Sequence, residues 1–304
     1  MKKREKRYRW AICIFFSLFI LLDMSKKTKK QPCRTCGHET KSFFNDDIYQ
    51  SRVKVSAYRV IHKYLPEIKN SNCKVVVPKN HNKTLVLDLG TSFSNRCLFY
   101  FAANSKSHSQ CDKINHPDYA YGDYTNSGVA KVANNGKVTI KYRCPQAYRE
   151  KGFTYIPHIH FVLSSKGCEK WEENIYTHHI FCPMTKKEVD DTVKAECALL
   201  VNSLPITYFI KQSIPGSIPL PYTSFGEKDS LTEKDVDNYL KGCLAHVPRI
   251  KKAVDSGKLL LKDIPMIIYC YKASCDASHR LAKHLQKMGY TNLKHYKGGI
   301  LDYF

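Results

Sequence analysis

The chain has 304 residues, enough for two domains, and its composition of 43% hydrophobic and 25% charged residues excludes a disordered protein. Its 49 Lys and Arg against 27 Asp and Glu give a formal net charge of +22, spread along the chain without an Arg-rich stripe. Such a charge favours anionic surfaces. Its even spread indicates a solvated lysine surface, so nucleic acid is not an expected partner.

Residues 1–24 form a hydrophobic segment between basic flanks. Trp10–Leu22 is apolar, six of the first nine residues are Lys or Arg, and lysines follow Asp23. Thirteen residues of helix reach roughly 20 Å, short of the ~30 Å hydrocarbon core, although flanking lysines can snorkel. We expect a short N-terminal helix that anchors the protein to a membrane, with a signal peptide as the alternative. A membrane is therefore the expected partner, with the folded domains on one side of it.

Residues 25–72 read as a basic linker with one helix over Ile48–Leu65, ended by Pro66. Cys33 and Cys36 form the only close pair among the thirteen cysteines, with His38 after it. A zinc site needs four ligands and no second pair exists. The pair therefore remains open as a redox shuttle, as half of a site shared with another chain, or as a pair without a function, and the redox compartment stays undecided.

Residues 73–185 carry short apolar runs separated by Asn, Gly, Ser and Pro. Such runs without intervening helices predict an antiparallel β-sandwich, and Asn134-Asn-Gly136 is a hairpin signal. The predicted strands are Val75–Val77, Leu85–Leu89, Cys97–Phe101, Val129–Val132, Val138–Tyr142 and His158–Leu163.

Residues 186–304 change to alternating strands and helices, which indicates a parallel α/β sheet with crossover helices. The predicted elements are strands at Ala198–Val201, Met266–Cys270 and Leu293–Tyr296, and helices at Thr232–Leu240 and Ser278–Met288.

Cys270 ends the apolar run Met266-Ile-Ile-Tyr-Cys270, which is typical of a buried parallel strand. A short loop then leads to Ser278, the expected N-cap of the next helix. Backbone N–H groups at such a turn favour a thiolate, so we expect a lowered pKa and the highest thiol reactivity at Cys270. Cys275 lies five residues on and can resolve a persulfide as a disulfide, and Lys272 is the nearby cation.

This loop and helix resemble the active-site segment of the rhodanese (sulfurtransferase) family. Gly289-Tyr-Thr-Asn-Leu-Lys-His-Tyr-Lys-Gly-Gly299 is similar to its ending and Ser213-Ile-Pro-Gly-Ser-Ile-Pro-Leu-Pro221 to its second signature. The resemblance spans about 110 residues, with Ala198–Ser203 as the first strand, and implies sulfur transfer through Cys270. A small sulfur donor or a thiol protein is then the implied partner.

The chain departs from that family at several positions. Asn202 and Ser203 stand where the family has Asp and Arg, and Ser213 where it has His. The loop after Cys270 is longer than usual, and Arg280 comes too late for a phosphatase cradle. An inactive rhodanese fold kept for binding is therefore an open alternative.

Part of the preceding domain resembles intradiol dioxygenases. Gly128–Tyr148 followed by Ile156-Pro-His-Ile-His-Phe161 is similar to the end of that domain. The resemblance implies ferric iron bound by Tyr148, His158 and His160, and histidines at i and i+2 of a strand do face one side. The second tyrosine ligand remains open among Tyr119, Tyr121 and Tyr124. The alternative is an inert sandwich whose histidines pair with other groups, and His178-His179 reads as a polar strand end.

These features predict a membrane-anchored protein with a sandwich followed by a rhodanese-like domain. The first functional hypothesis is sulfur transfer or thiol redox chemistry at Cys270. The second is a non-catalytic structural or interaction protein built from two degenerate enzyme folds, with unknown protein partners. Because the Lys-, Asn- and Tyr-rich composition resembles proteins of large DNA viruses, a virion or host membrane is a concrete location for that second hypothesis.

Overall fold

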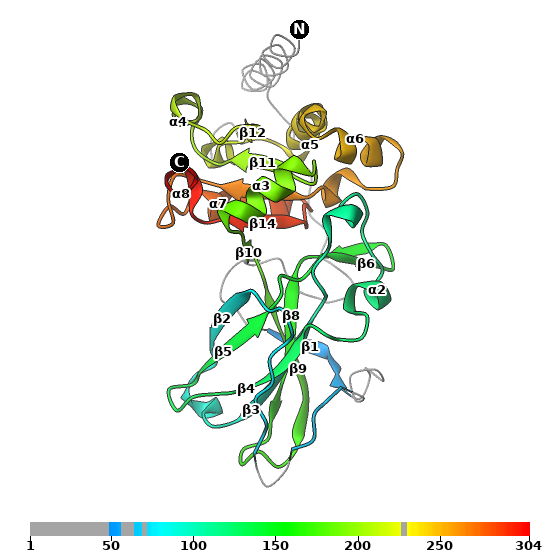
Figure 1. Cartoon of the computed structure of the whole chain (residues 1–304), viewed down its shortest axis with the longest axis vertical. Coiled ribbons are helices and arrows are strands. Elements are labelled where there is room, and N and C mark those ends of the chain that lie inside the picture. The colour runs from blue at the N-terminus through cyan, green and yellow to red at the C-terminus, as the bar shows by residue number, and fades with distance from the viewer. Residues whose placement is uncertain (1–48, 56–63, 69–71, 226–229) are drawn as a thin grey trace. The chain divides into compact units, whose positions relative to one another are not determined.

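The computed structural model describes residues 49–55, 64–68, 72–225 and 230–304 (Figure 1). They fall into two compact units. The first contains Ser107–Ile114 and Phe181–Phe304, and the second contains the other described residues up to Ile180. The hydrophobic segment Trp10–Leu22 and the Cys33/Cys36 pair lie outside the described residues. Within those residues, no helix has the length and apolarity needed to span a bilayer.

The second unit is built on a five-stranded sheet in the order β1-β9-β8-β3-β4, with all neighbours antiparallel. Two further antiparallel pairs, β2–β5 and β6–β7, complete its strands. The antiparallel β prediction is thus confirmed for this part of the chain. The elements are β1 Tyr49–Lys54, β2 Lys83–Asp88, β3 Cys97–Ala102, α2 Pro117–Tyr121, β4 Ser127–Lys131, β5 Lys137–Tyr142, β6 Tyr148–Glu150, β7 Phe153–Tyr155, β8 His158–Ser164 and β9 Trp171–His179.

The predicted helix over Ile48–Leu65 is wrong where the structure describes it. Tyr49–Lys54 forms strand β1 and pairs with the distant strand β9, which the sequence reading also missed. Tertiary pairing across about 120 residues overrides the local helical pattern here. Val75–Val77 is not a strand either, because only Val76 forms a bridge, to Val129.

The core of the second unit explains why β3 and β8 lie in the middle of the sheet. All six residues of β3 are buried, as are six of the seven residues of β8. A continuous apolar run is what a strand covered on both faces requires.

Gly136 makes the expected turn, with Gly136 N–H donating to the Ala133 carbonyl at 2.9 Å.

The first unit contains a five-stranded parallel sheet in the order β10-β14-β13-β11-β12. This confirms the predicted α/β alternation. The elements are β10 Cys182–Pro183, α3 Lys186–Lys194, β11 Leu199–Asn202, α4 Ile206–Lys211, β12 Ser217–Pro219, α5 Glu233–Cys243, α6 Pro248–Asp255, β13 Met266–Tyr269, α7 Ala277–Lys287, β14 Leu293–Tyr296 and α8 Gly299–Tyr303.

Helix α7 begins one residue before its predicted start. Asp276 is its N-cap, without a side-chain cap bond, and Ser278 lies inside the first turn with its side chain fully buried. Ser278 is therefore not a helix cap, and its hydroxyl is free for another contact. Helix α5 begins one residue after its predicted start, with Thr232 as its N-cap and the Thr232 hydroxyl accepting from the Asp235 N–H.

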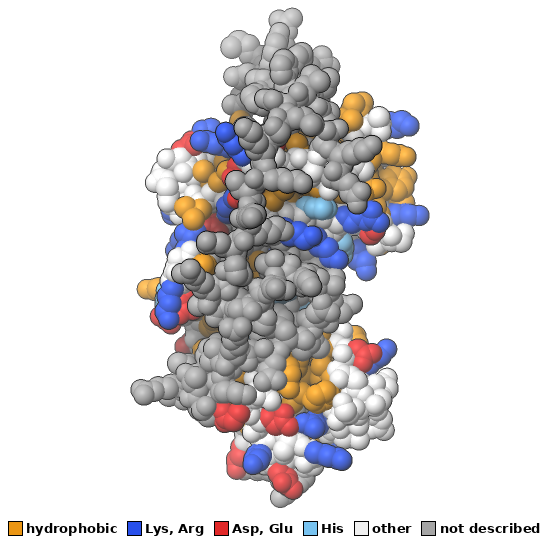
Figure 2. All heavy atoms as spheres, turned by 180° about the vertical axis from the view of Figure 1, so that it is seen from behind, with side chains coloured by type: hydrophobic (Ala, Val, Ile, Leu, Met, Phe, Trp, Pro, Cys, Tyr) orange, Lys and Arg blue, Asp and Glu red, His pale blue; other side chains and the backbone are white. Residues whose placement is uncertain are grey.

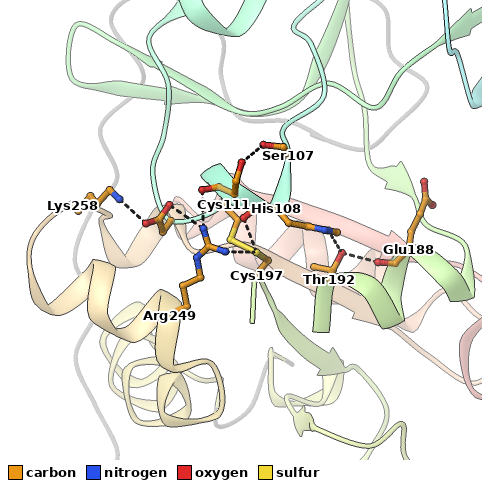
Figure 3. The surroundings of a disulfide bond; sticks show 10 residues. Ser107, His108, Cys111, Glu188, Thr192, Cys197, Arg249 and Lys258 are labelled. Atoms are coloured by element: carbon orange, nitrogen blue, oxygen red, sulfur yellow. Dashed lines mark hydrogen bonds and ion pairs between the residues drawn. A yellow bond between two sulfur atoms is a disulfide. The ribbon is translucent and has the colours of Figure 1, made fainter. Parts of the chain in front are cut away.

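A disulfide fixes the segment Ser107–Ile114 within the first unit. Cys111 is bonded to Cys197, 86 residues later (Figure 3). Arg249 donates to the Ser109 carbonyl at 2.8 Å, and Lys258 forms an ion pair with Asp112 at 2.5 Å. The segment is thus held by one covalent bond and by side chains from the α6 region.

Charged side chains are mixed rather than gathered over the described part of the face shown in Figure 2. Lys and Arg side chains alternate there with Asp and Glu. This agrees with the even spread of charge along the sequence.

Candidate functional site

Cys270 follows directly after strand β13, at the carboxyl edge of the parallel sheet. Its side chain packs in a cluster with Leu200, Tyr269, Ala277 and Tyr296, and the residue is only 1% exposed. The strand-loop-helix arrangement expected around this cysteine is therefore present. The sulfur itself is buried.

The groups around the Cys270 sulfur are mainly acceptors. Its thiol lies 3.5 Å from the Lys272 carbonyl oxygen and 3.4 Å from the Cys275 carbonyl oxygen, and donates toward them. Burial, and after it the neighbouring Cys275, raise the pKa of Cys270 to about 11, although Ser278 and the Lys272 backbone act to lower it. The predicted lowering of this pKa is therefore wrong, because burial favours the neutral thiol.

Cys275 is the second free thiol of the loop. It is partly exposed, lies next to four exposed residues (271–274), and its backbone carbonyl accepts from the Cys270 thiol at 3.4 Å. Lys272 is exposed, and its contact with the Cys270 sulfur is made by its backbone carbonyl. The loop thus brings together a buried thiol and a reachable one.

Two of the three positions that depart from the rhodanese pattern, Asn202 and Ser203, belong to a buried polar network around Tyr269, whereas Ser213 is half-buried. Asn202 donates to the Tyr269 hydroxyl at 3.0 Å, and the Ser203 hydroxyl donates to the Tyr269 carbonyl at 2.8 Å. That Tyr269 hydroxyl also contacts the hydroxyl of Ser217 at 2.8 Å. These side chains fix the end of β13 just before Cys270. The sequence did not single out Tyr269, which was counted only as part of the apolar run Met266–Cys270.

A second cluster lies in the other unit, around His158 of β8. The His158 Nε2 atom is 3.0 Å from His160 Nε2 and 3.1 Å from the Tyr148 hydroxyl. The expected convergence of Tyr148, His158 and His160 is therefore confirmed. Tyr121 of α2 joins them, with its hydroxyl 3.3 Å from His158 Nε2 and 3.4 Å from the Tyr148 hydroxyl. Of the three candidate tyrosines, Tyr121 is the one that meets the cluster; Tyr119 is 81% exposed.

A polar group of the protein contacts the Nδ1 atom of each histidine and orients its ring. His158 Nδ1 lies 2.6 Å from the Ile156 carbonyl, and His160 Nδ1 lies 2.8 Å from the Thr177 hydroxyl. Burial lowers the pKa of His158 to about 4 and that of His160 well below its usual value, so both rings are neutral. A neutral imidazole whose Nδ1 atom is tied to a carbonyl, as in His158, presents an Nε2 lone pair, as metal-ligating histidines do.

Several polar groups of this cluster converge on one atom, His158 Nε2. A carbonyl only accepts, so His158 Nδ1 carries the proton and its Nε2 has one lone pair. Three polar groups approach that lone pair within 3.3 Å. A cation at their centre would satisfy all four side chains, so the residues fit a metal ion. Among the described residues no three His, Cys, Asp or Glu gather in this way, so such a site depends on its tyrosines.

Residues 185–304 match the protein family described as "Rhodanese-like domain". A comparison with curated proteins found no match. A structure of a rhodanese-related protein from Thermoplasma volcanium is 17% identical, with a TM-score of 0.26, and the match covers 40% of this chain and 90% of that chain. A human single-domain sulfurtransferase is 16% identical with a TM-score of 0.26, covering 40% and 93%. An uncharacterized protein from Saccharomyces cerevisiae is 20% identical with a TM-score of 0.28, covering 40% and 90%.

Proposed function

Because residues 185–304 form a rhodanese-like domain, we propose that the protein has a sulfurtransferase-type function carried by the thiol pair Cys270 and Cys275. The observation that carries the proposal is the geometry of the pair. Two free thiols lie in one loop, one of them buried and the other partly exposed, and the buried thiol donates to the backbone carbonyl of the other residue at 3.4 Å. In such a pair the exposed thiol meets the substrate and the buried thiol resolves the product.

The roles therefore differ from those expected for a single sulfur-carrying cysteine. Cys275 loses its proton to solvent, and its thiolate attacks the outer sulfur of a sulfane donor such as thiosulfate. A sulfur–sulfur bond forms on Cys275, the donor's own sulfur–sulfur bond breaks, and sulfite leaves with the electron pair.

Cys270 completes the reaction in a second step. Its sulfur attacks Cys275 Sγ, a disulfide forms between the two cysteines, and the outer sulfur leaves as hydrosulfide, which takes up the Cys270 proton. Two thiols are oxidised by two electrons and the sulfane sulfur is reduced by two. A small external thiol returns the pair to its reduced form by two exchange steps.

Mass spectrometry of two single variants tests the proposal. Trypsin cuts after Lys272 and so places Cys270 and Cys275 in different peptides. With thiosulfate, Cys270→Ser is expected to accumulate one extra sulfur on the Cys275 peptide, because the resolving thiol is gone. Cys275→Ser is expected to acquire none on the Cys270 peptide at the same exposure, since that thiol is buried and neutral.

Two results would overturn these roles. Sulfur on the Cys270 peptide of Cys275→Ser, at the rate seen for Cys275, would return the carrier role to Cys270. Absence of sulfur from both variants would reject sulfur transfer and leave a binding role for the domain. Cys243→Ser, which alters a buried cysteine outside any disulfide in the same unit, is the matched control.

The Tyr121, Tyr148, His158 and His160 cluster favours a second candidate function. We propose that these four side chains hold a ferric ion, as the resemblance to intradiol dioxygenases implies. Two tyrosine oxygens and two imidazole nitrogens are ligands that ferric iron accepts. Such an ion would supply Lewis-acid and one-electron redox chemistry, while Ile156 and Thr177 hold the two imidazoles in place.

Metal content and visible absorption test this site independently of any activity. Protein loaded with ferric iron and then desalted is expected to retain one iron per chain and to show tyrosinate-to-iron charge-transfer absorption. Tyr121→Phe and Tyr148→Phe should each weaken that absorption. Tyr124→Phe is the matched control, because its ring stacks on Tyr121 at 5.4 Å in the same aromatic group. Wild-type protein that retains no iron would contradict the proposal.

A further inference from the structure

A cysteine outside any disulfide lies against a disulfide of the second unit. Cys73 is bonded to Cys97, and Cys168 Sγ lies 3.4 Å from Cys97 Sγ. All three residues belong to one buried core cluster. Among the described residues of this unit, Cys168 is the only cysteine that is not in a disulfide. Neither the proposed sulfur transfer nor the proposed metal site uses these three sulfurs.

The turn between β8 and β9 holds Cys168 in this position. The Ser165 N–H donates to the Lys170 carbonyl at 2.8 Å, and the Cys168 N–H donates to the Ser165 carbonyl at 3.0 Å. Cys168 has φ +54°, a left-handed conformation that glycine adopts at lower cost than any residue with a Cβ atom. Packing as a small apolar side chain explains why Cys168 is buried, but it does not explain a cysteine at this backbone position. The contacts of its sulfur give a better reason.

The Cys168 sulfur is held beside Cys97 by its neighbours. The Cys168 thiol donates to the Asn95 carbonyl at 3.3 Å, and the Ser164 Oγ atom lies 3.4 Å from the same sulfur. That Ser164 oxygen also accepts from the Cys97 N–H at 3.0 Å, so one side chain contacts both cysteines. Cys97 Sγ is therefore the disulfide sulfur that a Cys168 thiolate meets. Attack on that sulfur makes Cys73 the leaving group.

Cys73 lies in a stretch of chain that solvent can reach. The residue is 8% exposed, while Asn72 before it and residues 74–77 after it are exposed. This stretch has a second attachment at Val76, whose N–H donates to the Val129 carbonyl at 3.0 Å and whose carbonyl accepts from the Val129 N–H at 2.8 Å. Loss of the bond to Cys97 would therefore free the Cys73 thiol at the surface without detaching the stretch at Val76.

We propose that Cys73, Cys97 and Cys168 form a thiol–disulfide exchange site that presents Cys73 to external disulfides. The Cys168 thiolate attacks Cys97 Sγ, a Cys97–Cys168 disulfide forms, and the Cys73–Cys97 bond breaks. Cys73 leaves with the electron pair and takes up the proton that Cys168 has lost, so the protein undergoes no net oxidation.

The freed Cys73 then reacts with a small disulfide such as glutathione disulfide. Its thiolate attacks one of the two glutathione sulfurs, a mixed disulfide forms on Cys73, and the glutathione disulfide bond breaks. One glutathione leaves with the electron pair and takes up the Cys73 proton. The Cys73 sulfur is thereby oxidised and the departing glutathione sulfur is reduced.

Peptide mapping after exposure to glutathione disulfide tests the site. Trypsin places the three cysteines in separate peptides, Asn70–Lys74, Cys97–Lys106 and Gly167–Lys170. The folded full-length protein is incubated with glutathione disulfide, unfolded in N-ethylmaleimide to block the remaining thiols, and digested. We expect glutathione on the Cys73 peptide and a disulfide between the Cys97 and Cys168 peptides, rising together in equal amounts.

Two variants separate exchange from direct reaction of other thiols. Cys168→Ala is expected to slow glutathione addition at Cys73 by at least ~10-fold, because the attacking thiol is gone. Cys243→Ala, which removes a buried cysteine outside any disulfide in the other unit, is the matched control and should react like the wild type. Equal addition at Cys73 in Cys168→Ala and the wild type would overturn the proposal.

Cys73→Ser tests the new bond without the exchange step. This variant is expected to be isolated with Cys97 bonded to Cys168, because the two sulfurs already lie in contact. Recovery of both of its peptides alkylated and unlinked would show that these sulfurs do not bond, and would reject the site. In the wild type, glutathione on the Cys168 peptide with Cys73–Cys97 intact, or on none of the three peptides, would also reject it.

Discussion

His158 shows how one buried residue makes the stability of its unit depend on pH. Its pKa is lowered to about 4 because burial disfavours the charged ring. An unfolded histidine titrates near 6.5, so between about pH 6.5 and 4 the unfolded chain binds a proton that the folded chain does not. Stability is therefore complete above about pH 6.5 and falls as the pH drops to 4, by about 3 kcal/mol for this group.

Urea unfolding of metal-free protein at pH 7.5, 6 and 4.5 measures this loss. Trp171 lies in β9 beside Phe99 and reports on the second unit, provided that Trp10 is replaced by Phe. The His158→Gln variant should be less stable than the wild type at pH 7.5, and its free energy of unfolding should change less with pH. An unchanged slope in that variant would assign the acid sensitivity to other groups.

Residue-level predictions succeeded where spacing alone fixed the geometry. His158 and His160 face one side because they stand two apart in a strand, and that needed no tertiary information. Tyr121 could not be chosen over Tyr119 or Tyr124, because the short helix α2 that selects it was not visible as a pattern. The pKa of Cys270 was mispredicted because motif position does not reveal how deeply the sulfur is buried.

At the scale of elements, the Gly298-Gly299 ending positions the Cys270 loop. Helix α8 begins at Gly299, and its Ile300 N–H donates to the Cys270 carbonyl at 3.1 Å. Gly299 has φ +66°, and a Cβ there would lie 2.3 Å from that same carbonyl oxygen. The glycine is thus required by both conformation and space.

Gly299→Ala is expected to destabilise the first unit by at least ~2 kcal/mol more than Gly257→Ala. Gly257 is the matched control, because it also has a left-handed backbone, φ +72°, but no atom within 4 Å of an added Cβ. Thermal unfolding followed by circular dichroism compares the two variants. Equal losses of stability in the two variants would mean that the backbone around Cys270 shifts to accommodate the added methyl group.

Strands with local signals were predicted well, and those defined by distant partners were not. Leu293–Tyr296 matches β14 to the residue, and Cys97–Phe101 is one residue short of β3. Strands β1 and β9 were missed because their residues are mixed in polarity and gain their order from each other. Local composition cannot encode a pairing of that kind.

At the scale of the whole molecule, disulfides bond six of the ten described cysteines. They are Cys73, Cys97, Cys111, Cys144, Cys182 and Cys197. Such usage is typical of proteins that fold in an oxidising compartment, so we expect this protein to mature in one. The sequence left that point open, because cysteine spacing does not show which residues meet.

The Cys111–Cys197 disulfide is expected to decide whether Ser107–Ile114 stays docked. Without it the segment keeps exposed or half-exposed ion pairs such as Lys258–Asp112, each worth roughly 0–1 kcal/mol, whereas a disulfide contributes about 2–5 kcal/mol. Replacing both cysteines by Ala should therefore speed tryptic cleavage after Lys113 severalfold. Cys243→Ala, which removes a buried cysteine outside any disulfide in the same unit, should not speed this cleavage. Equal cleavage of double variant and wild type would show that side-chain contacts suffice.

The central claim is that Cys275 accepts the sulfur and that Cys270 then forms a disulfide with it. The product formed by the wild-type protein tests this claim most directly. Reduced protein is mixed with one equivalent of thiosulfate, quenched with acid and an alkylating reagent, and digested with trypsin. We predict that the peptides Asp263–Lys272 and Ala273–Arg280 are recovered joined by a disulfide, with one hydrosulfide released per bond. Recovery of both peptides singly alkylated and unlinked, with thiosulfate unconsumed, would contradict the account.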